Sequence, residues 1–121
     1  EKFDVILNME VIEHVSKPIF FLNCCNKLLK PNGLMICSTI NRNLKSFVFA
    51  IIGAEYILKW LPKGTHEWKK FITPNELSKM LKDSNFTLLD KKGFVLDKLK
   101  WEWKVSSSDL SVNYVTSSKK N

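Results

Sequence analysis

The chain has 121 residues, of which 19 are Lys or Arg and 12 are Asp or Glu, so its formal net charge is +7. This length supports one domain with a modest core. The three cysteines lack C-x-x-C spacing, which argues against a disulfide framework and against a zinc site. The positive charge favours an anionic partner such as phospholipid, nucleic acid or an acidic metabolite.

The first expected element is a strand over residues 3–8, built on the apolar run Val5, Ile6 and Leu7. Because this run is continuously apolar rather than alternating, it favours a parallel strand that is buried on both faces. Polar side chains follow at Asn8 and Glu10. In open parallel sheets, ligands bind beyond the carboxyl ends of the strands, so we expect the chemistry at this strand end.

If the chain becomes helical after Met9, then Glu10, Glu13 and His14 stand at positions i, i+3 and i+4 and share one helix face. Two carboxylates and an imidazole can hold a divalent cation that keeps open positions for substrate oxygens. The same residues are also typical of a solvated first helical turn, where acidic side chains are favoured. The spacing alone leaves both interpretations open.

A βαβ unit is predicted next. Pro18 begins a helix that the turn at residues 30–33 ends, with Gly33 able to adopt a positive φ. Residues 34–40 then form a second strand, which we expect to be parallel to the first and joined to it by a right-handed connection. Asn41 and Arg42 follow that strand end, so they should lie beside Glu10. Arg42 could face an anion or only solvent.

Residues 43–70 form an insertion that is both apolar and basic. Residues 47–61 are almost wholly apolar, but the run is too short and too interrupted for a membrane span, which needs about 20 apolar residues. Tryptophan and basic residues around apolar ones are typical of segments that lie at a membrane interface. The alternative is a buried helix that covers the active site. The residues expected at a membrane are Phe49, Ile52, Lys59, Trp60 and Lys63.

The last part of the chain is expected to hold one helix and two or three strands. Thr73, Pro74 and Glu76 predict a capped helix start. Residues 86–96 predict a strand that could be broken near Gly93, and residues 99–105 a loop wall or a short strand. A turn at 106–109 precedes a last strand at 112–116, and residues 117–121 are expected to be a frayed polar tail.

Four sequence segments carry a family resemblance: FDVILNMEVIEHV at 3–15, STINRNLKS at 38–46, GAEYIL at 53–58 and PKGTH at 62–66. Together they resemble the ubiquinone biosynthesis O-methyltransferase family of class I S-adenosylmethionine-dependent methyltransferases. The resemblance implies an α/β fold, namely the C-terminal half of a Rossmann-like methyltransferase fold with a mostly parallel sheet and an antiparallel last strand. Residues 1–121 would be a partial methyltransferase domain without its glycine-rich cofactor-binding half, since the four glycines form no G-x-G-x-x-G pattern.

The resemblance also implies a reaction, which is the transfer of a methyl group from S-adenosylmethionine to a polyprenylated catechol or demethylubiquinol. The family pattern assigns Glu10 and His14 as catalytic residues, Glu10, Glu13 and His14 as ligands of Mg²⁺, and Met9 as a cofactor-lining residue. Asn8 stands where cysteine is frequent in the family. A chain that lacks half of its cofactor site could also be a non-catalytic fragment that retains a lipid- and substrate-binding surface.

The implied partners are the polyprenylated substrate, an anionic membrane surface and other proteins of ubiquinone biosynthesis. Nucleic acid is not expected, because the basic residues flank an apolar run instead of interleaving with aromatic residues along a strand. The implied location is cytoplasmic and peripheral at a bacterial inner membrane, or at the matrix face of the mitochondrial inner membrane.

Overall fold

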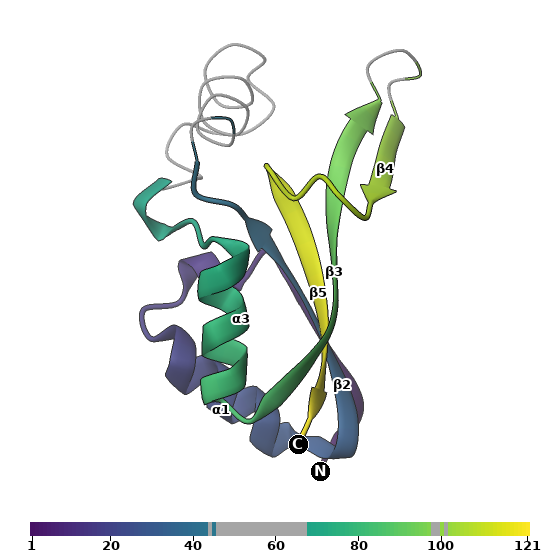
Figure 1. The fold of residues 1–121 in the computed structure, drawn as a ribbon. Coiled ribbons are helices and arrows are strands. Elements are labelled where there is room, and N and C mark those ends of the chain that lie inside the picture. The colour runs from purple at the N-terminus through teal and green to yellow at the C-terminus, as the bar shows by residue number, and fades with distance from the viewer. Residues whose placement is uncertain (44, 46–67, 98–99, 101) are drawn as a thin grey trace.

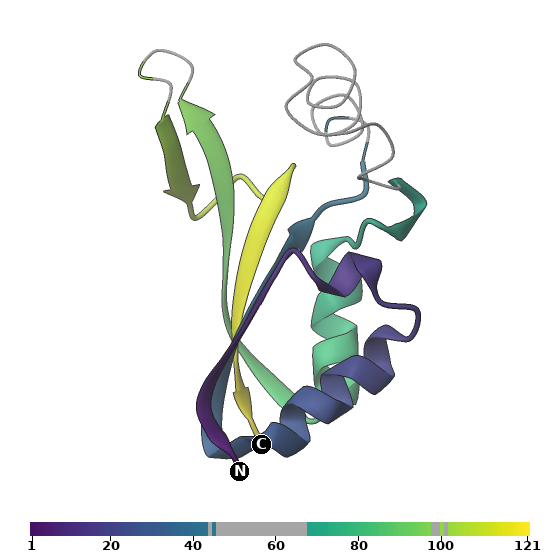
Figure 2. The same cartoon turned by 180° about the vertical axis from the view of Figure 1, so that it is seen from behind.

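The computed structural model describes residues 1–43, 45, 68–97, 100 and 102–121 (Figure 1). The described helices and strands lie in two layers, with the two described α-helices on one face of a five-stranded sheet (Figures 1 and 2). The strands are β1 (Phe3–Met9), β2 (Leu29–Ile40), β3 (Phe86–Asp97), β4 (Glu102–Ser106) and β5 (Asn113–Lys120). The helices are α1 (Pro18–Leu28) and α3 (Pro74–Asp83), and η1 (Ile12–His14) and η3 (Trp68–Lys70) are short 3-10 turns.

The strand order is β1-β2-β5-β3-β4. β1 and β2 are parallel, with Met9 opposite Ser38, which confirms the predicted βαβ unit. β5 inserts between β2 and β3 and is antiparallel to both, and β4 is antiparallel to β3. The expected α/β fold with an antiparallel last strand is therefore confirmed. The sheet is mixed, however, and only one of its four described pairings is parallel.

The core lies between the helices and the sheet. It contains fully buried side chains from η1, α1, β2, α3 and β5, including Ile12, Leu22, Met35, Leu81 and Tyr114. α3 contributes Leu77 and Leu81 from one face, which follows from their helical spacing. Ile12, which follows β1, and Ile72, which follows β2, both belong to this core, so the segments after the two strands pack against the helices.

The opposite face of β1 is open. Val5 and Leu7 have 50% and 65% of their surface exposed, whereas Asn8 is buried at 6%. The expectation that this strand is buried on both faces is not met in the described part of the chain, because both described α-helices lie on the other face (Figure 2).

The C-terminal residues differ from the expected frayed tail. Residues 117–120 belong to β5, in the middle of the sheet, and Ser118 is fully buried. The predicted tail was wrong because backbone pairing with β2 and β3 on both sides outweighs the low strand propensity of serine and lysine.

No helix in the described part of the chain is long and apolar enough to cross a membrane.

Candidate functional site

The site begins where β1 ends. Glu10 has a φ of 57°, in the left-handed region that non-glycine residues seldom occupy. Its backbone N–H donates to the carbonyl oxygen of Ser38 at 3.0 Å and lies 3.2 Å from the Ser38 hydroxyl. These contacts bind the backbone that follows β1 to Ser38, near the end of β2. They also fix the direction in which the Glu10 side chain leaves the backbone.

Glu13 follows on η1, a single 3-10 turn, instead of on the predicted α-helix. Glu10 precedes this turn, and its positive φ breaks the helical spacing that would place Glu10, Glu13 and His14 on one face. Glu13 is buried, at 4% exposed, while His14 is exposed. The structure brings Glu10 and Glu13 together and leaves His14 outside the pair.

Each carboxylate accepts a hydrogen bond from a neutral donor on a neighbouring strand. The Asn113 side-chain amide donates to Glu10 Oε1 at 2.9 Å, and the Thr39 hydroxyl donates to Glu13 Oε2 at 3.0 Å. The remaining oxygens, Glu10 Oε2 and Glu13 Oε1, are buried and have no hydrogen-bond partner among the described residues. Buried polar atoms without a partner are uncommon and costly, which marks this place as chemically unusual.

The protonation of Glu10 reflects this environment. Burial, followed by the neighbouring Glu13 carboxylate, raises its pKa from 4.5 to about 8, and the hydrogen bond from Asn113 opposes the rise. Burial, followed by the charge of Glu13, raises the pKa of the Cys37 thiol to about 12, and a neutral thiol is a poor nucleophile.

The expected three-ligand metal centre is not formed. The described residues include no group of three or more His, Cys, Asp or Glu side chains placed to hold a metal ion. Of the three expected ligands, the structure brings together the Glu10 and Glu13 carboxyl groups, each with one buried oxygen that has no hydrogen-bond partner among the described residues, and carboxylate oxygens are the ligand type that hard divalent cations take. The imidazole of His14 does not join them.

Two other predicted residues have definite positions. Met9 is 48% exposed at the end of β1, on the sheet face opposite buried Asn8. Arg42 faces neither an anion from outside nor open solvent. Its guanidinium donates to the Phe71 carbonyl at 3.0 Å and to Glu76 Oε1 at 2.6 Å, tying the end of β2 to the start of α3.

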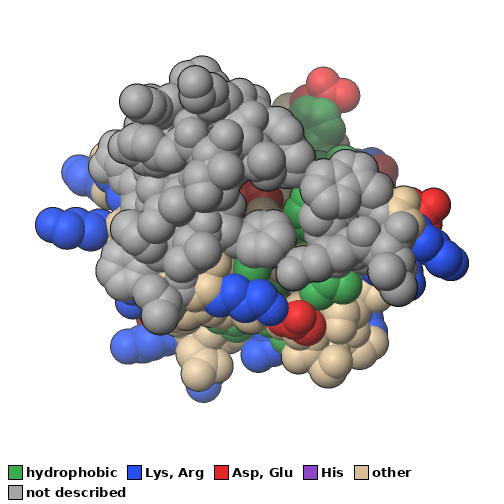
Figure 3. All heavy atoms as spheres, turned by 90° about the horizontal axis from the view of Figure 1, so that it is seen from above, with side chains coloured by type: hydrophobic (Ala, Val, Ile, Leu, Met, Phe, Trp, Pro, Cys, Tyr) green, Lys and Arg blue, Asp and Glu red, His purple; other side chains and the backbone are tan. Residues whose placement is uncertain are grey.

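Of the predicted insertion at 43–70, the structure describes Asn43, Lys45 and residues 68–70. The residues expected at a membrane, Phe49, Ile52, Lys59, Trp60 and Lys63, lie outside the described residues. The end of the molecule where β2 finishes carries Lys and Arg side chains around its rim (Figure 3).

Thr39 and Asn113 were not predicted as site residues. Thr39 sits in an apolar strand, where a threonine usually signals only strand propensity. Asn113 is 103 residues from Glu10, and only the antiparallel register that pairs it with Ile40 brings it to the site. No local pattern could have identified it, because its role depends on the insertion of β5 beside β2.

A family model described as a methyltransferase domain matches residues 1–91. The chain belongs to this methyltransferase family. It is 62% identical over 120 residues to a ubiquinone biosynthesis O-methyltransferase from Roseobacter denitrificans, a match that covers 99% of this chain and 48% of that protein. The resemblance seen in the sequence is thereby confirmed, and the chain spans about half the length of the curated relatives it matches.

The fold is also that of methyltransferases. A SAM-dependent methyltransferase from Thermotoga maritima, described as a possible histamine N-methyltransferase, superposes with a TM-score of 0.75 at 17% identity and covers 100% of this chain and 57% of that one. Magnesium protoporphyrin IX methyltransferase from Synechocystis, solved with bound SAH, superposes with a TM-score of 0.60 at 15% identity and covers 99% and 46%. At these identities the likeness concerns the fold alone.

Proposed function

We propose that the complete protein containing this chain is an O-methyltransferase of ubiquinone biosynthesis. It would transfer the methyl group of S-adenosylmethionine to a hydroxyl of a polyprenylated catechol or demethylubiquinol. The observation that carries the proposal is the 62% identity to a ubiquinone biosynthesis O-methyltransferase over 120 residues that include the carboxylate pair. The position of that pair, beyond the carboxyl ends of two parallel strands, supports it.

In the proposed reaction the bond between the sulfonium sulfur and the methyl carbon breaks as a bond forms between that carbon and the ring oxygen. The hydroxyl loses its proton, and the demethylated cofactor leaves as a thioether. Because the displacement is in line, the main contribution of the protein is to position the two reactants. Glu10 and Glu13 are held rigidly enough at the strand ends to serve as such a positioning site.

Glu10 and Glu13 are the residues that we propose to hold Mg²⁺. A bound divalent cation lowers the pKa of a catechol hydroxyl and orients the ring oxygens. His14 lies outside the pair and is exposed, so we propose that its imidazole accepts the hydroxyl proton instead of acting as a third ligand. Met9, exposed at the end of β1, is proposed to line the cofactor site.

The test uses the complete protein, with formation of the methylated product followed by mass spectrometry. Glu10→Gln and His14→Ala are each expected to lower the rate about 100-fold, the lower end of the range for lost acid–base or charged groups. Only Glu10→Gln should also weaken the response to added Mg²⁺, and neither should change the affinity for S-adenosylmethionine. Glu102→Gln, at an exposed position on β4, is the matched control.

Unchanged rates in both variants would contradict the proposed site. A complete protein that binds the polyprenylated catechol but never methylates it would favour the non-catalytic alternative, in which the chain supplies only a lipid- and substrate-binding surface. The isolated 121-residue chain is expected to be inactive in the same assay, since its sequence contains no G-x-G-x-x-G pattern.

We further propose that residues 43–70 contact an anionic membrane surface, with Phe49, Ile52 and Trp60 entering the interface and Lys59 and Lys63 meeting lipid headgroups. The support is compositional, because apolar, tryptophan and lysine residues together are typical of interfacial segments. A polyprenylated substrate resides in the bilayer, which would place the protein at the cytoplasmic or matrix face of an inner membrane, together with other proteins of the same biosynthesis.

Co-sedimentation with vesicles tests this contact. Binding to anionic vesicles should exceed binding to neutral ones and should weaken with added salt, because each lysine near an anionic surface contributes roughly 1 kcal/mol before screening. The triple change Phe49→Ser, Ile52→Ser and Trp60→Ser should reduce binding at an unchanged melting temperature. Phe20→Ser, on the exposed side of α1, is the control. Equal binding to both vesicle types would favour a buried helix that covers the active site.

A further inference from the structure

The carboxylate pair has an unusual pattern of hydrogen bonds. Glu10 and Glu13 are each held through one oxygen by a neutral donor, and each keeps its second oxygen unsatisfied. In the described part of the chain, the Ser84 hydroxyl is the one other buried side-chain polar atom that lacks a partner. Two of the three such atoms therefore belong to a single pair of interacting side chains.

The neutrality of the two donors is informative. A lysine or arginine in either position would neutralise a carboxylate and close the site to a cation. The two described cations that follow the end of β2 are engaged with other carboxylates, because Arg42 pairs with Glu76 at 2.6 Å and Lys45 pairs with Asp109 at 3.6 Å. Asn113 and Thr39 thus orient the two carboxyl groups without placing a positive charge beside them.

Thr39 is fixed by its surroundings. It is fully buried in β2, and it pairs with Tyr114 of β5, which is also fully buried. Because the Thr39 hydroxyl is buried, it cannot turn to bind solvent instead. Its hydrogen bond to Glu13 Oε2 therefore restricts the rotation of that carboxylate.

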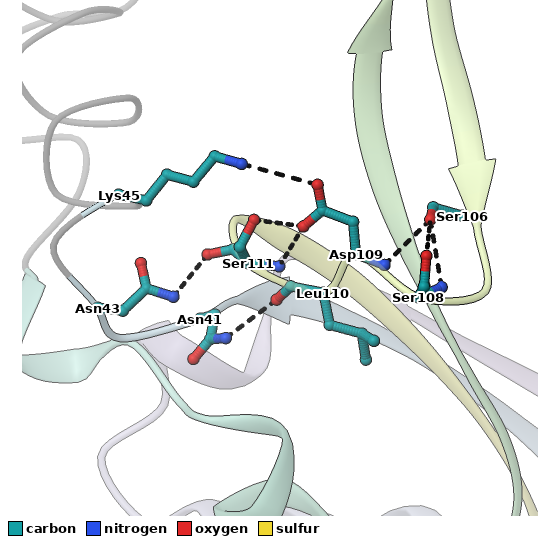
Figure 4. A network of polar contacts seen from close by, with 8 residues as sticks. All are labelled: Asn41, Asn43, Lys45, Ser106, Ser108, Asp109, Leu110 and Ser111. Carbon is teal, nitrogen blue, oxygen red and sulfur yellow. Dashed lines mark hydrogen bonds and ion pairs between the residues drawn. The ribbon is translucent and has the colours of Figure 1, made fainter.

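The segment that precedes Asn113 is bound to the polypeptide after β2, and Figure 4 shows the contacts of Asn41 with Leu110 and of Asn43 with Ser111. The Asn41 side-chain amide donates to the Leu110 carbonyl at 3.0 Å, its backbone N–H donates to the Val112 carbonyl at 2.7 Å, and the Asn43 amide donates to the Ser111 carbonyl at 2.7 Å. These contacts lock residues 110–112 to the end of β2. The position from which Asn113 reaches Glu10 is therefore set by the polypeptide immediately after β2.

We propose that Asn113 and Thr39 are positioning residues, which hold one oxygen of Glu10 and one of Glu13 so that the second oxygens stay free to bind a divalent cation. This inference rests on the proposed cation site of the methyltransferase. The two residues act through the carboxylates and touch neither substrate nor cation. Hydrogen-bond partners of metal ligands orient those ligands and tune their basicity, and their loss typically weakens metal binding.

The test measures Mn²⁺ binding to the complete protein by electron paramagnetic resonance, with no substrate present. Asn113→Leu and Thr39→Val each remove a donor at nearly constant volume and should weaken Mn²⁺ binding about 10- to 100-fold. Thr39→Ser retains the hydroxyl and should restore binding. Thr116→Val is the matched control, because Thr116 is a fully buried threonine whose hydroxyl donates to the Cys37 carbonyl and not to a carboxylate.

Wild-type binding of Mn²⁺ by Asn113→Leu and Thr39→Val would overturn the positioning role and leave the cation site standing. Equal losses in Thr39→Val and Thr116→Val would also overturn it, since any buried threonine would then have the same effect. If the wild-type protein methylates its substrate and yet binds no Mn²⁺ and needs no Mg²⁺, the cation site of the proposed function fails, and the positioning role fails with it. Melting temperatures of all variants show whether each remains folded.

Discussion

At the scale of single residues, the protonation of Glu10 gives a pH dependence with a definite sign. Burial, followed by the hydrogen bond and charge of Glu13, raises the pKa of Glu10 from 4.5 to about 8 in the folded protein. Between these two values the folded state retains a proton that the unfolded state releases, so the free energy of unfolding falls as pH rises from about 4.5 to about 8. Well above pH 8, Glu10 is deprotonated in both states, so it no longer makes the free energy of unfolding depend on pH.

Glu10→Gln removes this titration and keeps a side chain of the same size. In buffer with a chelator, the variant should be more stable than the wild-type protein at pH 8.5, by about 1 kcal/mol or more, and should approach it near pH 4.5. Urea unfolding at the two pH values measures the difference. A variant that is less stable than wild type at pH 8.5 would contradict the raised pKa.

Glu76 supplies a control of opposite sign. Burial is the largest single effect and raises its pKa, but the hydrogen bonds from Thr73 together with the hydrogen bond and charge of Arg42 outweigh it and lower the pKa. Its stabilising contribution is therefore present above the ordinary glutamate pKa and is lost as pH falls through the lowered value. Glu76→Gln should accordingly reduce the pH dependence at the acidic end, where Glu10→Gln has little effect.

At the scale of elements, the local sequence was sufficient to predict a helix start or a strand end that depends only on residues close to it in the chain. The Thr73 hydroxyl accepts from the Glu76 backbone N–H at 3.2 Å, and the Glu76 carboxylate accepts from the Thr73 N–H at 3.1 Å, so the predicted capping box is confirmed. The helix at Pro18 and the strand end at Ile40 were also predictable, because proline and a continuous apolar run act within a few residues.

Local signals failed where a distant segment decides the geometry. The turn predicted at residues 30–33 is part of β2 in the structure, and the positive φ there belongs to Asn32, at 62°, and not to Gly33. Gly33 is instead required by close approach, since a Cβ there would lie 2.9 Å from the Lys30 carbonyl oxygen. Similarly, Gly93 does not break β3. A Cβ at Gly93 would lie 1.6 Å from the Asp109 carbonyl oxygen, so the loop before β5 crosses directly over this glycine.

At the scale of the whole molecule, β5 connects the carboxylate pair at one end of the sheet with the end of α1 at the other. Its first residue, Asn113, reaches the carboxylate pair at one end of the sheet. At the other end the Lys120 ammonium donates to the Asn26 and Leu29 carbonyls at 2.7 and 2.9 Å, where α1 ends. Lysine is favoured at a helix C-terminus, because the last carbonyls have no partner within the helix and carry partial negative charge.

The contacts of Lys120 predict that this last part of the chain stabilises the fold. In the complete protein, Lys120→Met should lower the free energy of unfolding by about 1.5–3 kcal/mol, the range for hydrogen bonds made by a charged group. Lys119→Met, one residue earlier on the same strand and on its other face, should change it by less than about 0.5 kcal/mol. Deletion of residues 117–121 removes half of a strand that pairs on both sides and should cost more than either substitution. Urea unfolding compares the three proteins with wild type. A deletion variant as stable as the wild-type protein would mean that these residues behave as the frayed tail that their composition suggests.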